Sequence, residues 1–274
     1  MSQSTVVRAN ILVHSKMADS YNQNEPHFRP ENQAKVRKNL EAIAAKRRGR
    51  LLDMGCGTGF LINLAKDLFP QIDGIDVTQA MLDRVDRSGG NITLHNVEVE
   101  SLPFPDGTFD VVTGYAFLHH LQDYALALRQ AYRVLKPGGI AYFDLEPNRL
   151  YWDTIRAVDS RKFGALPPII VREIDSVLHT DDRVNEEFGI DQDTFNQAEY
   201  TKSIAGGIAP HEFEKIARDL DFSSCVTTYE WYMGQASVMH GQSFEASAVV
   251  ENYLRSVLPV TGGLFKYLKF ELTK

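Results

Sequence analysis

The chain contains few cysteines, and it lacks both an excess of positive charge and a long apolar run. Its two cysteines, Cys56 and Cys225, are too few and too far apart for a four-ligand zinc site or a disulfide framework. A protein that binds bulk DNA or RNA normally carries a basic surface, whereas here 29 Lys and Arg stand against 36 Asp and Glu, a formal net charge of −7. The sequence therefore argues against a nucleic-acid partner.

The hydrophobic pattern also excludes several classes of protein. No apolar run reaches the ~18 residues that a membrane-spanning helix needs, so we expect no membrane span. The first residues show no charged start followed by a continuous apolar core, so we expect no signal peptide and a cytoplasmic location. Hydrophobic residues make up 43% and charged residues 24% of the 274, which is usual for a globular protein with one large domain and additions.

Short apolar runs alternate with helical patterns over the first half of the chain. The runs predicted to be strands cover residues 51–54, 72–75, 92–95, 109–115 and 140–144. The segments predicted to be helices cover residues 30–46, 60–68, 79–87 and 121–135. Such alternation indicates an α/β fold, Rossmann-like, with a mostly parallel sheet and helices on both faces. Ligands bind such sheets at the carboxyl ends of the strands.

The alternation breaks after Pro147 and returns later in the chain. Residues 211–220 predict a helix, residues 225–229 a strand, residues 244–258 a second helix that Pro259 ends, and residues 268–272 a half-buried last strand. We therefore expect seven strands, an antiparallel C-terminal strand and two helical inserts in a single domain. Its predicted parts are an N-terminal helical lid (1–48), a cofactor-binding core (49–147), a substrate or lid insert (148–208) and the late half of the core (209–274), with a second insert at about 232–265.

A glycine-rich loop between the first predicted strand and its helix carries the most information. It reads Asp53-x-Gly55-x-Gly57-x-Gly59. Glycine lets the backbone turn sharply and approach a ligand, and the helix that follows offers free N–H groups to an anion. A dinucleotide-binding fingerprint would require glycine where Phe60 stands, and the Gly-Lys-Ser/Thr of a P-loop is absent. The loop therefore matches neither of these two motifs.

The spacing of this loop resembles that of the class I S-adenosylmethionine (SAM)-dependent methyltransferases, and further motifs continue the resemblance over residues 35–147. An acid, Asp76, ends the second strand, and Glu98-Val99-Glu100-Ser101-Leu102-Pro103-Phe104 is similar to the family's Asp-Ala-x-x-Leu-Pro-Phe segment. The later motifs are Phe104-Pro105-Asp106-Gly107-Thr108-Phe109-Asp110, Leu118-His119-His120-Leu121 and Leu135-Lys136-Pro137-Gly138-Gly139. The set is typical of the branch with ubiquinone/menaquinone-type and many secondary-metabolite methyltransferases.

The resemblance implies SAM as cofactor, S-adenosylhomocysteine as product and no metal. It places Asp76 on the ribose hydroxyls, Glu98 on the adenine amino group and the Val99 N–H on the adenine ring. Met81 packs on adenine or belongs to the core, and Tyr21 belongs to a lid over the cofactor or to the core. The implied cofactor contacts are Asp53, Gly55, Cys56, Gly57, Gly59, Asp76, Val77, Met81, Glu98, Val99, Tyr115 and Tyr21.

Methyl transfer from a sulfonium is an in-line displacement with an excellent leaving group, so the protein mainly orients the reactants and excludes water. A general base is needed only when the acceptor loses a proton. His119 is the candidate base, whereas His120 is expected to have a structural role. Glu146 either faces the substrate or anchors a loop. The residues predicted for the substrate pocket or lid are Glu146, Tyr151, Trp152 and Trp231.

The sequence thus predicts a SAM-dependent methyltransferase that acts on a small molecule at an oxygen or carbon atom. Two alternatives remain open at this point. One is an RNA or protein methyltransferase, and the other is a SAM-binding regulatory subunit without catalysis of its own.

Overall fold

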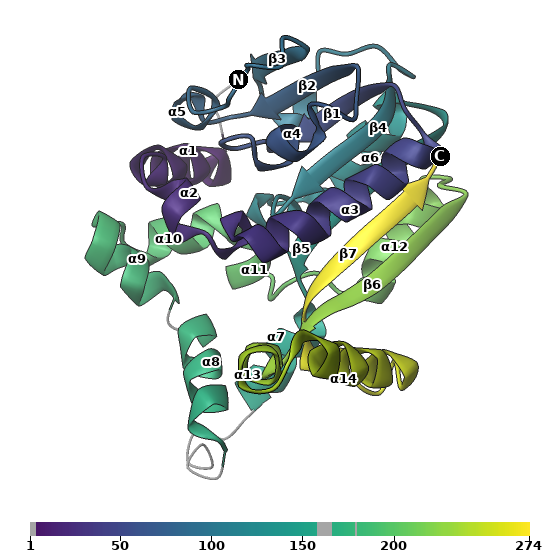
Figure 1. The fold of residues 1–274 in the computed structure, drawn as a ribbon. Coiled ribbons are helices and arrows are strands. Elements are labelled where there is room, and N and C mark those ends of the chain that lie inside the picture. Colours follow the sequence, from purple (N-terminus) through teal and green to yellow (C-terminus); the bar gives the residue numbers. More distant parts are fainter. Residues whose placement is uncertain (1–3, 158–165, 179) are drawn as a thin grey trace.

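A seven-stranded sheet runs through the computed structural model, which describes residues 4–157, 166–178 and 180–274 (Figure 1). The strands are β1 (Arg50–Met54), β2 (Gln71–Asp76), β3 (Ile92–Asn96), β4 (Phe109–Tyr115), β5 (Leu135–Pro147), β6 (Ser224–Tyr232) and β7 (Phe265–Thr273). Their order is β3-β2-β1-β4-β5-β7-β6, and β7 is antiparallel to both of its neighbours. The other neighbouring strands pair in parallel. The predicted fold class is therefore confirmed.

Helices cover both faces of the sheet, so its central strands are apolar on both sides. On one face lie α3 (Pro30–Lys46) and α4 (Phe60–Ala65). Val36, Leu40 and Ile43 recur at helical spacing on α3 and pack with Leu51 of β1. The neighbouring Leu52 points to the opposite face, because successive side chains of a strand alternate.

The second face carries α6 (Tyr124–Val134) and α12 (Pro210–Asp219). Asp123 caps α6 by accepting a hydrogen bond from the Ala125 N–H at 2.9 Å. On α12, Phe213 is fully buried and stacks on Phe270 of β7 with ring centroids 3.6 Å apart. The large apolar cluster of this face therefore holds the antiparallel strand in place.

A short turn, η2 (Val99–Ser101), follows β3, and further helices come from the N-terminal segment and the two inserts. Before α3 lie α1 (Thr5–Met17), α2 (Tyr21–Asn24) and the short η1 (Pro26–Phe28). The first insert forms α7 (Arg149–Ala157), α8 (Pro168–Leu178), α9 (Thr180–Phe188), α10 (Gln192–Ala198) and α11 (Tyr200–Ser203). The second insert forms α13 (Gln235–Gly241), α14 (Phe244–Ser256) and η5 (Gly262–Leu264). None of the described helices is both long and apolar enough to cross a membrane.

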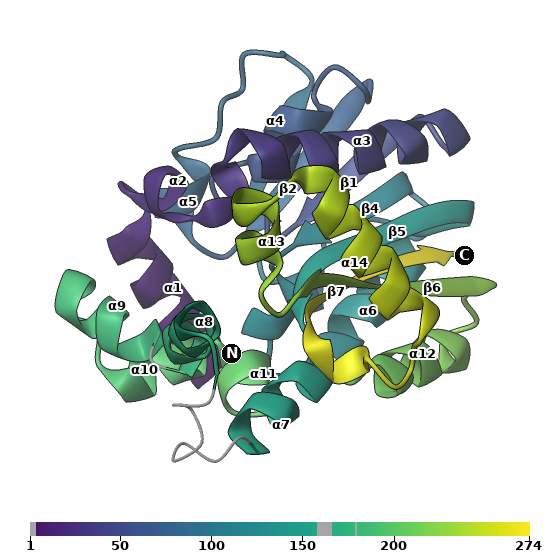
Figure 2. The same ribbon diagram turned by 60° about the horizontal axis from the view of Figure 1, so that its bottom comes forward.

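Two of these segments, far apart in the sequence, form one helical unit. Figures 1 and 2 show α1 beside α9 and α10, next to the carboxyl ends of the strands. Ala9 and Val13 of α1 share a small buried cluster with Phe195 of α10. Lys16 donates to the backbone carbonyls of Phe188 and Gly189. We call residues 5–24 and 180–203 together the helical cap.

Several strands are longer than predicted, above all β5, which begins at Leu135 rather than residue 140, and three helices of the first half of the chain also differ in length from the sequence prediction. The helix α5 (Gln79–Leu82) ends early, because the next N–H groups, those of Arg84 and Val85, bond to carbonyls three residues back rather than four. The helix α4 likewise ends at Ala65 rather than residue 68. The predicted helix 121–135 begins at Tyr124, because a separate turn, η3 (Leu118–His120), precedes it. The last difference brings the His119–His120 pair to the end of β4.

The stacked pair Phe213–Phe270 yields a test of the core. We predict that Phe270→Ala lowers the free energy of unfolding by about 3–5 kcal/mol, because it leaves a cavity between β7 and α12. The matched control is Val226→Ala on β6, where the side chain is 58% exposed, with an expected loss below about 1 kcal/mol. Urea denaturation of the two variants checks this, and equal losses would contradict the packing described.

Candidate active site

A cavity of about 780 Å³ lies at the carboxyl ends of β1, β2 and β4. This is the place where the strand order reverses, and open α/β sheets bind their ligands there. Residues of the glycine loop, of the segment after β3, of the end of β4 and of the helical cap line it. Its volume lies in the upper part of the range of about 300–1,000 Å³ that is usual for small-molecule pockets.

The backbone conformation of the loop after β1 requires glycine at three positions. Gly55, Gly57 and Gly59 have φ values of 65°, 52° and 87°, which side-chain-bearing residues rarely adopt. A Cβ at Gly55 would also collide with the ring of Phe117, and one at Gly59 would lie 2.9 Å from Val85 Cγ1. The loop therefore keeps its backbone exposed to the cavity on one side and packed on the other.

Two carboxyls, the buried Asp53 and the half-buried Asp76, face the cavity from the ends of neighbouring strands. Asp53 accepts a hydrogen bond from the Thr113 hydroxyl at 2.9 Å. Asp76 accepts from the N–H groups of Gly57 at 3.0 Å and Thr78 at 2.8 Å. Burial raises the pKa of Asp53 to about 7, and the nearby Asp76 adds to the rise. Burial also raises the pKa of Asp76, against the effect of its two backbone donors.

The sequence prediction of the cofactor contacts agrees largely with the wall of the cavity. Eleven of the twelve predicted residues line it, among them Asp76, Met81 and Glu98. The exception is Gly59, which is the N-cap of α4 and packs on Val85. The structure thus brings these residues together around one space, although they come from five separate segments of the chain.

The N-terminal segment closes one side of the cavity with aromatic rings. Tyr21 and His27 line the wall and contact each other, with ring centroids 6.0 Å apart. Burial lowers the pKa of His27 to about 4 and raises that of the Tyr21 phenol, so both side chains are neutral at neutral pH. The Thr58 hydroxyl, in the glycine loop, donates to Asn22 Oδ1 at 2.6 Å. This bond ties the cap to the loop.

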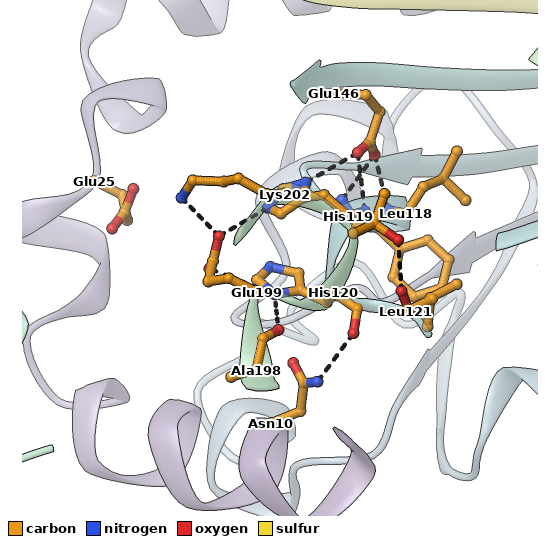
Figure 3. A network of polar contacts seen from close by, with 12 residues as sticks. Asn10, Glu25, Leu118, His119, His120, Leu121, Glu146, Ala198, Glu199 and Lys202 are labelled. Atoms are coloured by element: carbon orange, nitrogen blue, oxygen red, sulfur yellow. Dashed lines mark hydrogen bonds and ion pairs between the residues drawn. The ribbon is translucent and has the colours of Figure 1, made fainter. Parts of the chain in front are cut away.

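A polar network lies between the end of β4 and the cap (Figure 3). Glu146 is fully buried and accepts from the N–H groups of Phe117, Leu118 and His119, so it anchors the turn after β4. The His119 ring donates through Nδ1 to Glu146 Oε2 at 2.9 Å. His119 is not among the residues that line the cavity, whereas His120 is. The position of His119 therefore does not favour its predicted role as a base.

Groups of the cap complete this network. His120 Nδ1 donates to the backbone carbonyl of Ala198 at 2.9 Å, and Asn10 of α1 donates to the His120 carbonyl at 3.2 Å. Glu199 Oε1 lies 3.5 Å from His120 Nδ1, and its Oε2 lies 2.6 Å from Lys202 Nζ. Burial raises the pKa of Glu199, but Lys202 and the two imidazoles outweigh burial and hold it well below its usual value.

The same cluster has the composition of a metal site. The ligand atoms of His119, His120 and Glu199 lie within 4.8 Å of one another. Two contacts oppose a metal ion in this arrangement, because the Lys202 ammonium already sits on Glu199 and His120 Nδ1 is bonded to the Ala198 carbonyl. The cation that neutralises this carboxylate in the structure is Lys202.

The predicted substrate residues lie elsewhere. Tyr151 and Trp152 of α7 are buried in a small apolar cluster with residues of α8. Trp231, at the end of β6, lies beside Lys35, whose ammonium is 5.4 Å from the indole centroid. None of these three, nor Glu146, lines the cavity formed by the described residues. Their part in acceptor binding stays a prediction.

Three residues that line the cavity did not emerge from the sequence. His14 and Asn10 of α1 and Tyr200 of α11 lie on its wall. His14 and His120 make an edge-to-face ring contact with centroids 4.9 Å apart, although 106 positions separate them in the chain. Helical spacing alone marks such residues as part of an amphipathic helix, and only the packing of the cap shows that they reach the site.

Comparison with known proteins agrees with this geometry. The family described as "Methyltransferase domain" matches residues 52–143. The ubiquinone/menaquinone biosynthesis C-methyltransferase of Proteus mirabilis is 31% identical over 195 residues, which cover 63% of this chain and 76% of that protein. The demethylmenaquinone methyltransferase of Listeria welshimeri is 34% identical over 154 residues, which cover 52% of this chain and 65% of that protein.

Solved structures share the fold at low sequence identity. A SAM-dependent methyltransferase from Archaeoglobus fulgidus superposes with a TM-score of 0.56 at 15% identity, covering 93% of this chain and 97% of that one. One from Mesorhizobium loti gives 0.53 at 18% identity, with coverages of 86% and 96%. The fold, the glycine loop with its two acids and the curated relatives all agree with the predicted resemblance. The chain belongs to the class I SAM-dependent methyltransferases, in the branch of the ubiquinone/menaquinone-type enzymes.

Proposed function

We propose that this methyltransferase binds SAM along the glycine loop and methylates a ring carbon of a small hydroxylated aromatic molecule of the quinol type. The observation that carries the proposal is the charge of the cavity wall. Five acidic residues line it, and the described wall contains no lysine or arginine; the acids are Asp53, Asp76, Glu98, Glu100 and Asp123. Such a wall suits a cationic sulfonium and an uncharged acceptor, and it disfavours an acceptor that carries phosphate.

The two carboxyls divide the cofactor between them in this proposal. Asp76 accepts the ribose hydroxyls, while its backbone donors, the N–H groups of Gly57 and Thr78, keep the carboxylate in place. Asp53 faces the ammonium of the methionine part, with Thr113 holding its orientation. Charged hydrogen bonds of this kind contribute about 1.5–3 kcal/mol each.

The segment after β3 and α5 would hold the adenine between them. Glu98 and the Val99 N–H are proposed to bond to it, and Met81 and Val77 to pack against its faces. Met81 is 2% exposed, and its Cε lies 3.6 Å from the place of a Cβ on Gly57, so the thioether borders both the loop and the cavity. A soft, flexible side chain suits such a contact with an aromatic ring.

The predicted parts of the chain acquire roles in this proposal. The core 49–147 binds the cofactor, and the lid 1–48 together with the insert 148–208 covers the acceptor. The second insert, 232–265, lies away from the cavity wall. SAM supplies the methyl group on a sulfonium, which is an excellent leaving group. The chain contributes orientation and the exclusion of water, which the aromatic rings of Tyr21, Tyr115 and Phe117 in the wall support.

The acceptor class rests on the curated relatives and on the chemistry of the wall. Both relatives described above are named for the methylation of quinone precursors. The hydrogen-bonding rings that the cap places in the cavity wall are His14, Tyr21 and Tyr200, beside His120. Imidazoles and phenols pair well with the hydroxyl groups of a hydroquinone.

The ribose contact leads to a direct prediction. Asp76→Ala should weaken SAM binding by about 10²-fold or more, because it removes two charged hydrogen bonds. The matched control is Asp83→Ala, at the end of α5, which should leave the affinity within about twofold. Calorimetric titration of both variants with SAM checks this. Equal affinities would refute the placement of the ribose.

The raised pKa of Asp53 predicts that SAM binding depends on pH. Below pH 7 the carboxyl of the free protein is mostly protonated, and a cationic ligand favours its ionised form. The dissociation constant should therefore rise by up to about tenfold between pH 7 and pH 6 and change little above pH 8. Asp53→Asn should bind more weakly at pH 8 and lose this pH dependence. An unchanged slope in that variant would contradict the assignment.

The acceptor class is tested with a reduced naphthoquinone that bears one short isoprenoid chain and a free ring position. We expect the wild-type protein to add one methyl group to the ring carbon in the presence of SAM, as detected by mass spectrometry and proton NMR. The oxidised quinone should remain unmethylated, because its ring carbon is not nucleophilic. Methylation of tRNA or protein instead, with none on this acceptor, would refute the proposed substrate class.

A further inference from the structure

His120 lines the cavity, and among the described residues one of its ring nitrogens makes no hydrogen bond. Its Nδ1 lies 2.9 Å from the Ala198 carbonyl, and a carbonyl can only accept, so Nδ1 carries the proton. Among the described residues Nε2 makes no hydrogen bond. It is not one of the fully buried atoms without a partner, so it remains accessible. Because His120 lines the cavity, a bound acceptor meets an accessible imidazole lone pair.

The groups around His120 together favour the neutral form of its imidazole. Burial, His119 at 4.2 Å between ring centroids and His14 of α1 lower its pKa well below the usual value. Glu199 opposes them from the cap, 3.5 Å from Nδ1, and Lys202 of α11 is paired with that carboxylate. The resting ring is therefore neutral and able to accept a proton at neutral pH.

Glu199 is placed to hold the charge that proton transfer would create. Its low pKa keeps it ionised, and only 8% of the residue is exposed, so little solvent screens its field. The Ala198 carbonyl fixes the plane of the imidazole. A neutral ring oriented by a backbone acceptor, with an anion beside it, has the arrangement of a general base supported by an acid.

We propose that His120 takes the hydroxyl proton of the acceptor through Nε2 and that Glu199, supplied by the insert, stabilises the resulting imidazolium. This inference rests on the function proposed above. As the O–H bond breaks, its electron pair moves into the ring, and the ortho carbon forms the new C–C bond to the methyl group. The C–S bond breaks, and its pair stays on sulfur. The ring then loses its C–H proton and regains the hydroxyl proton, so that one proton in total passes to solvent.

His119 has a different part in this arrangement. Its Nδ1 is bonded to Glu146, and its Nε2 lies 3.7 Å from Glu199 Oε2, away from the cavity wall. It therefore acts through its neighbours as a positioning residue. His120 is the catalytic residue, and Glu199 is a second positioning residue.

The first test compares His120→Gln, Glu199→Gln and His119→Gln over a range of pH with the reduced naphthoquinone as acceptor. At pH 7 we expect the rate constant of methyl transfer to fall by about 10²-fold or more in the first variant and by about tenfold in the second. Both deficits should shrink near pH 10, where the hydroxyl of the acceptor ionises without a base. A purely structural role would leave the deficits constant.

Two controls separate catalysis from folding and cofactor binding. Glu187→Gln removes another acid of the same insert, one that accepts from Asn24, and should keep the wild-type rate. His119→Gln should show a deficit that does not depend on pH. The SAM dissociation constant of His120→Gln should stay within about threefold of wild type. If His120→Gln fails to fold, two other measurements test the proposal. They are the rescue of His120→Ala by added imidazole and the pH dependence of the rate of Glu199→Gln.

The second test does not use turnover. In the wild-type protein with S-adenosylhomocysteine, nitrogen-15 NMR of labelled histidines should show His120 neutral with the proton on Nδ1. Adding the reduced naphthoquinone should shift Nε2 toward the protonated value, and Glu199→Gln should diminish that shift. A proton on Nε2 in the free protein, or no shift on adding the acceptor, would overturn the inference.

The outcomes also distinguish this inference from the proposed function. A wild-type protein that binds SAM but does not methylate the hydroquinone refutes the proposed acceptor and the inference with it. A wild-type protein that methylates it while His120→Gln is equally active, or is impaired to the same degree at every pH, refutes the inference alone.

Discussion

The site depends on two carboxyls that the fold brings side by side at the ends of β1 and β2. Asp53 and Asp76 both have raised pKa values, which means that the ligand-free protein carries them at a cost in free energy. Backbone N–H groups and a hydroxyl offset part of that cost, and a cationic ligand would offset more. The conformation of the glycine loop brings the Gly57 N–H to Asp76, and the second donor, the Thr78 N–H, follows β2. The same two carboxyls therefore affect both the local stability of the ligand-free protein and its affinity for a cationic cofactor.

In the proposed function the cap has a second task, which is to exclude water while leaving space for an acceptor. The segments 5–24 and 180–203 pack on each other through their own small apolar cluster and reach the core through a few directed hydrogen bonds. Such polar attachments break more readily than a shared core, so the cap suits a part that must admit a second molecule. Glu199 of the same unit lies 3.5 Å from His120, which lines the cavity, so the cap would also take part in the proposed chemistry.

Much of the fold could be predicted from the sequence because its signals are local. Proline at its first position and apolar residues at helical spacing gave both ends of the helix 30–46, and the alternation at the C-terminus gave the last strand. The residues predicted to contact the cofactor also come from local motifs, and eleven of the twelve line the cavity. The proposed acceptor side could not be predicted, because His14 and His120 meet only through tertiary packing. Tyr151 and Trp152, which were predicted for the substrate pocket, instead form a small core of the insert. A residue type that suits a pocket suits a small core equally well.

The most direct measurement of the central claim is the number of protons released when SAM binds at pH 7, obtained by calorimetry in two buffers that differ in ionisation enthalpy. The account predicts that SAM binding releases about half a proton from these carboxyls. S-adenosylhomocysteine should release less, because its sulfur carries no charge. Binding of SAM with no proton release, or with proton uptake, would contradict the claim that these two acids receive the charge of the cofactor.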